Sequence, residues 1–83
     1  MISVGGSSAG DPTIIFDIAN EKDWIMGVDN SNSNNFTISE DITLGGAPTR
    51  FTIAVGGNVG IGDTTPDAFL DIAGTTEQLR LAY

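Results

Sequence analysis

Short runs in which apolar and polar residues alternate recur along the chain at intervals of roughly 8–12 residues. The clearest is the range 49–55, in which Phe51, Ile53 and Val55 would share one face of a strand. Gly56-Gly57-Asn58 follows directly and suits a hairpin turn that needs positive φ angles. This punctuation predicts an all-β fold of about six to eight short strands joined by Gly and Asn turns.

Similar alternation predicts the remaining strands at 13–19, 23–29, 36–38, 42–44, 59–62, 68–73 and 79–83. The side chains expected on the apolar faces of the first two are Ile14, Phe16 and Ile18, and then Trp24, Met26 and Val28. Because Trp24 shares its face with Met26 and Val28, a core position is favoured over an exposed one that stacks on sugars. Between strands, the polar range 30–35 predicts a turn that tolerates left-handed backbone.

The length of 83 residues allows one small domain, and the sequence contains no Cys to form a disulfide. A domain of this size buries only about 60% of the surface that its unfolded chain exposes. These two facts favour a chain that shares its hydrophobic core with other chains.

The chain has 3 basic and 11 acidic residues, a net charge of −8. Binding to nucleic acid or to an anionic membrane needs the opposite charge, so neither is expected. No apolar stretch approaches the roughly 18 residues of a membrane span. The absence of His and Cys also excludes Cys/His zinc sites, thiol nucleophiles and His-containing triads.

One weak cation site can be drawn from Asp29, Ser31, Ser33 and Glu40, which fall at ligand positions of a calcium-binding loop. However, Asn34 stands where that loop requires Gly, and no helices are expected on either side. A plain polar turn is therefore favoured, and the sequence predicts no cofactor.

Enzyme chemistry has little support. Asp63, Asp67 and Asp71 are candidate paired carboxylates, but acidic residues in a β protein usually coat the solvent face. Gly57, Gly60 and Gly62 are spaced like phosphate-binding glycines, yet a Thr-Thr-Pro turn follows them rather than a helix. A tight turn and close packing of chains are the favoured interpretation, and no catalytic activity is predicted.

The segment 57–72, GNVGIGDTTPDAFLDI, resembles the GNVGIGTTSP-x-A-x-LDV segment of phage tail fibres and related trimeric fibre proteins. The upstream stretches 24–31 and 36–39 and the downstream stretch 75–81 resemble their usual neighbours, so the likeness covers 13–83. Asp63 departs from the pattern, in which Gly is followed directly by Thr-Thr. Such segments often precede an intramolecular chaperone domain of the endosialidase type.

The resemblance implies a homotrimeric fibre shaft or neck, with residues 13–83 as a module of a longer chain. The Gly and Ser content at the start of the chain predicts a flexible lead-in over residues 1–12. The module's partners would be neighbouring fibre domains or virion proteins, with a cell-surface receptor bound through the parent chain, and its location the virion. Gly60 and Gly62 would allow close packing between chains. The residues expected in the trimer core are Phe51, Ile53, Val55, Val59, Ile61, Leu70 and Ile72.

Two other functions remain open. A receptor- or glycan-binding adhesin module would use the 30–35 loop or Trp24. A capsid decoration or head fibre protein would share the trimer but attach to a shell.

Overall fold

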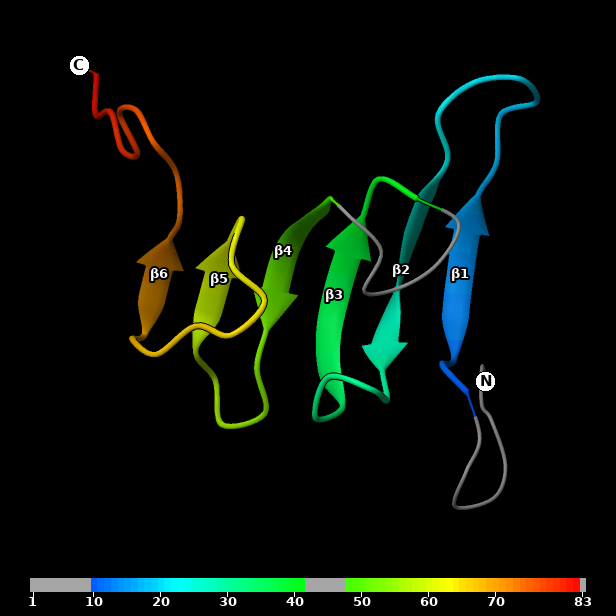
Figure 1. Ribbon diagram of the computed structural model, residues 1–83, viewed down its shortest axis with the longest axis horizontal. Coiled ribbons are helices and arrows are strands. Elements are labelled where there is room, and N and C mark those ends of the chain that lie inside the picture. Colours follow the sequence, from blue (N-terminus) through cyan, green and yellow to red (C-terminus); the bar gives the residue numbers. More distant parts are fainter. Residues whose placement is uncertain (1–9, 42–47, 83) are drawn as a thin grey trace.

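The computed structural model describes residues 10–41 and 48–82. Residues 1–9 of the predicted lead-in, the predicted strand at 42–44 and Tyr83 lie outside the described residues. Within them the chain is all-β, as predicted, and forms one sheet (Figure 1). Its strands are β1 (Thr13–Phe16), β2 (Trp24–Asp29), β3 (Asn35–Ser39), β4 (Thr49–Ile53), β5 (Val59–Ile61) and β6 (Leu70–Ile72).

The strands lie side by side in the order of the sequence. Each of the first five pairs antiparallel with the next, whereas β6 pairs parallel to β5. The parallel pairing requires a crossover, which residues 62–69 supply between the end of β5 and the start of β6. Sharp turns are made where the sequence predicts them: Gly56 and Gly57 have φ of 104° and 107°, and Ser33 and Asn34 of 58° and 62°.

The register aligns like side chains across the whole sheet. One level, the first apolar row, contains Val28, Phe36, Ile53, Val59 and Leu70. A second apolar row, two residues further along each strand, contains Ile14, Met26, Ile38, Phe51, Ile61 and Ile72. Because side chains two apart lie on the same face of a strand, both rows project from one side, here called the apolar face.

Between these rows runs a polar row that projects from the opposite side. Its members are Thr13, Gly27, Thr37, Thr52, Gly60 and Asp71. The crossover lies on this side, because the carbonyl oxygen of Asp63 is 2.2 Å from where a Cβ on Gly60 would stand. Figure 1 shows the crossover, in yellow, passing in front of β4 and β5. Thr37 and Thr52 are accordingly fully buried.

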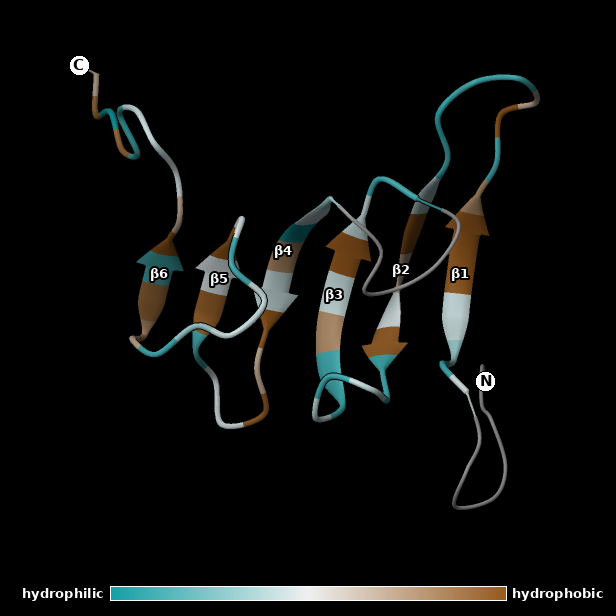
Figure 2. Cartoon of the chain, in the orientation of Figure 1, coloured by the Kyte–Doolittle hydropathy of each residue, from teal (hydrophilic) through white to brown (hydrophobic). Residues whose placement is uncertain are grey.

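The burial of the two sides is therefore the reverse of that in an ordinary sheet protein: polar side chains are buried, and the apolar rows are not. Among the described residues, Ile25 is the single buried hydrophobic residue, and it lies on the opposite side from the apolar rows. No member of either apolar row is buried, and Ile53, Ile61 and Leu70 remain 38%, 43% and 55% exposed. Figure 2 shows hydrophobic positions in every strand of this single layer.

Trp24 is 41% exposed in the single chain and lies on the same side of β2 as Met26 and Val28, so its burial in a core shared with other chains stays a prediction. Three predictions about strand lengths are wrong. Val55 lies beyond β4 in the hairpin turn, and Ile18 lies beyond β1; both are largely exposed. The alternation in 79–83 does not produce a strand over residues 79–82. Alternation alone does not make a strand where no neighbour supplies backbone hydrogen bonds.

Candidate interaction face

The apolar face is the candidate functional site. Its first row crosses β2 to β6 and its second row crosses all six described strands. Neither row includes a charged residue, although the chain carries a net charge of −8. Four of its side chains are exposed and the other seven are half-buried. An apolar surface that extends across a sheet in this way usually marks a site where another macromolecule binds.

Six of the seven predicted trimer-core residues lie on this face: Phe51, Ile53, Val59, Ile61, Leu70 and Ile72. Val55 does not, because β4 ends at Ile53. The prediction also omitted the half of the face that β1, β2 and β3 supply. Alternation signalled those positions too, but only the register shows that they continue the same two rows.

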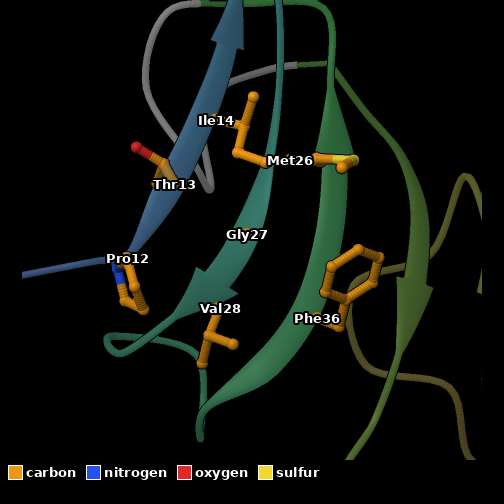
Figure 3. A pocket seen from close by; sticks show the side chains of 7 residues that line it. All are labelled: Pro12, Thr13, Ile14, Met26, Gly27, Val28 and Phe36. Atoms are coloured by element: carbon orange, nitrogen blue, oxygen red, sulfur yellow. The ribbon is translucent and has the colours of Figure 1, made fainter. Parts of the chain in front are cut away.

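A hollow of about 210 Å³ opens near the β1 edge of the apolar face. Figure 3 shows the side chains around it, with Ile14 from β1, Met26 and Val28 from β2, and Phe36 from β3. Pro12 forms its outer wall, held in place because its carbonyl oxygen accepts a hydrogen bond from Val28 N at 3.2 Å. Alternation along the sequence does not reveal this hollow, because its walls come from three strands and the residue before β1.

The two glycines predicted to permit close packing are both approached by the chain's own backbone. The Asp63 carbonyl packs on Gly60, and the Ala73 carbonyl oxygen lies 2.9 Å from a Cβ position on Gly62, where φ is +71°. Their small size therefore serves the crossover and the β5–β6 pairing within one chain. A role in packing between chains stays a prediction.

The residues of the weak cation site are not brought together. Asp29 and Ser31 form a local turn, in which the Asp29 carboxylate accepts hydrogen bonds from Ser31 N (3.1 Å) and Ser31 Oγ (2.7 Å). Glu40 lies beyond the far end of β3, about 16 Å away at the usual rise per residue, and forms an ion pair with Arg50. The structure groups no three acidic residues around a common point within the described ranges.

The carboxylates considered for catalysis have structural partners. Asp63 Oδ1 accepts a hydrogen bond from Thr65 N at 2.9 Å, and Asp71 Oδ2 accepts one from Asp67 N at 3.3 Å. These bonds shape the crossover.

A different acidic pair, Asp17 and Asp23, lies in the connection between β1 and β2. The pKa of Asp17 is raised because its protonated carboxyl hydrogen bonds to Asp23, with further contributions from the negative charge of Asp23 and from desolvation. This pair affects the electrostatics of the hairpin and lies outside the two apolar rows.

The two elements considered for glycan binding lie at opposite ends of β2. Trp24 begins that strand, and the polar turn follows Asp29 at its end. The turn is instead tied to the crossover, because Asn32 Nδ2 donates a hydrogen bond to the Thr64 carbonyl oxygen at 3.0 Å. A single site using both elements is not formed.

No described helix has the length and apolarity needed to cross a membrane. The chain matches no protein-family model and no curated protein sequence.

Proposed function

We propose that this chain is a structural module of a homotrimeric viral tail fibre, a stalk that holds a receptor-binding tip away from the particle. The observation that carries the proposal is the apolar face, because no hydrophobic side chain of its two rows is fully buried by the described residues.

The energetics favour burial of that face against copies of the same chain. Burying apolar surface contributes about 25 cal/mol per Å², and in a small chain without cysteines there is no disulfide to provide stability instead. Copies that each carry a charge of −8 repel one another through most surfaces. Contact through the uncharged rows avoids placing acidic side chains opposite each other.

The assignment to a fibre rests on the resemblance of residues 57–72 to fibre-shaft segments. The structure supports it in one respect: this segment forms β5, the crossover and β6, so the residues that carry the resemblance also build part of the apolar face. The role is mechanical, and the trimer would give the shaft its rigidity.

Sedimentation equilibrium of the purified chain tests the proposal. We expect a single species with the mass of three chains over a wide range of concentrations. A folded species of 8.6 kDa, the mass of one chain, would contradict it.

A further inference from the structure

We propose that the trimer closes edge to edge, with β6 of one copy lying against β1 of the next and the apolar faces turned inward. This inference rests on the proposed homotrimer and specifies its interface. In it, Leu70 of one copy would enter the hollow bounded by Pro12, Val28 and Phe36 of its neighbour.

The two edges of the sheet differ, and threefold symmetry requires such a difference. A ring of three identical chains requires an interface between two different patches, because a patch that binds itself produces a twofold dimer. The sheet offers two such patches, since its edges are formed by different strands. Both edges are apolar on the same face: β1 contributes Ile14 and Phe16, and β6 contributes Leu70 and Ile72. An interface normally ends in a polar rim, so apolar residues on both outermost strands indicate that both edges are covered.

The register of the sheet determines which residues of β6 and β1 would meet. Rotation about an axis parallel to the strands leaves each residue at its own height, so residues that meet must be level. Leu70 is level with Val28 through the first apolar row, and the Val28–Pro12 hydrogen bond extends that level to the β1 edge. Ile72 is level with Ile14 through the second row. Each row would therefore close into a ring.

The two edge strands also match in direction and in shape. The pairings make β1, β3, β5 and β6 run the same way, so β6 would meet the neighbouring β1 as a parallel strand. Leu70 is 55% exposed at one edge, and the hollow of about 210 Å³ opens near the other. An apolar cavity of about 150 Å³ accommodates benzene, so this hollow has room for a leucine side chain.

Disulfide trapping tests the inference, because the natural chain has no cysteine. The variant Ile14→Cys/Ile72→Cys places one thiol at each edge of the second row. Within one chain these positions are separated by five strand spacings, about 24 Å, and a disulfide needs Cα atoms within about 7 Å. Mild oxidation should therefore yield covalent trimers on a denaturing gel without reductant, and single chains with it.

A second pair keeps the test independent of the apolar rows. Thr13 and Asp71 are level on the polar row, so Thr13→Cys/Asp71→Cys should also give covalent trimers. The control is Ile14→Cys/Val55→Cys, whose second thiol is in the 73% exposed turn away from the β6 edge, and which should remain uncrosslinked.

The outcomes separate the two proposals. If sedimentation shows a trimer but neither pair crosslinks, or if the single Ile14→Cys variant forms dimers, the edge-to-edge interface is wrong while the trimeric fibre proposal stands. If the natural chain sediments as a monomer, both are wrong.

Discussion

The carbonyl oxygen of Asp63 occupies the space beside Gly60 in which any other residue would place its Cβ, 2.2 Å from that position. The contact holds the crossover against the polar row, above the buried Thr52. Because Gly60 has no side chain, the crossover can pass close to β5 and lead into β6, which pairs parallel to β5.

Gly60→Ala should therefore destabilise the fold. The added methyl group meets backbone atoms, which must shift, and overpacking of this kind costs about 1–3 kcal/mol. Urea unfolding at fixed protein concentration measures the loss. Gly74→Ala is the matched control, because the nearest atom to its Cβ is in the Gln78 side chain at 3.6 Å. Equal stability of the two variants would contradict the assigned role of Gly60.

The hydroxyl groups of Thr37 and Thr52 are paired in register, buried, and without a hydrogen-bond partner among the described residues. Replacing such a group with an apolar one of the same shape removes a desolvation cost, so Thr52→Val should raise the free energy of unfolding by about 1 kcal/mol. Thermal or urea unfolding measures the change. Thr49→Val is the control and should lower stability, because the Thr49 hydroxyl is 3.1 Å from Ser39 Oγ.

The raised pKa of Asp17 predicts a pH dependence of stability. A carboxyl with a higher pKa in the folded chain binds more protons when folded, so its stabilising contribution is complete below the unfolded pKa and is lost as the pH rises through the folded pKa. At low ionic strength, Asp17→Asn should reduce the decrease in the free energy of unfolding as the pH rises. In the natural chain, added salt should also reduce this decrease, because the group is exposed.

Unfolding free energies measured across the acidic range at fixed protein concentration test this expectation. Asp67→Asn removes one negative charge from the crossover and serves as the control for net charge. If Asp17→Asn has the same pH dependence of the unfolding free energy as the natural chain, the Asp17–Asp23 pair is not the cause of that dependence.

A charge placed in the apolar face should prevent association of the chains. Ile53 lies in the first apolar row and is 38% exposed, so Ile53→Asp introduces a carboxylate where we expect chains to meet. Losing one buried aliphatic side chain costs about 1.5–3 kcal/mol per copy, and burying an unpaired charge costs more. We expect light scattering to report single chains at concentrations where the natural chain is assembled.

Leu81→Asp provides the matched control, because Leu81 is 84% exposed and lies outside every described strand. Its assembly should equal that of the natural chain. Assembly of Ile53→Asp at natural strength would count against the apolar face as the interface.

The sequence predicted local structure well. Alternation located all six described strands, and the glycines and asparagines located the turns at 56–57 and 33–34. These features depend on neighbours in the chain, since a side chain's face follows from period two and a positive φ from the residue type.

What the sequence did not predict depends on contacts between distant segments. The parallel placement of β6 depends on where the crossover packs, and alternation is the same for either strand direction. Periodicity does not report whether another layer covers Trp24, which is 41% exposed in the single chain. Asp29 and Glu40 fit a ligand spacing, but an extended β3 separates them.

The parallel β6 also determines how the polypeptide passes through the module. Six strands in simple alternation would bring the chain out at the end where it entered. Here β1 and β6 run in the same direction, so the backbone enters the sheet at one end and leaves at the other. Units with this property can be joined head to tail, and each one added lengthens the structure without widening it.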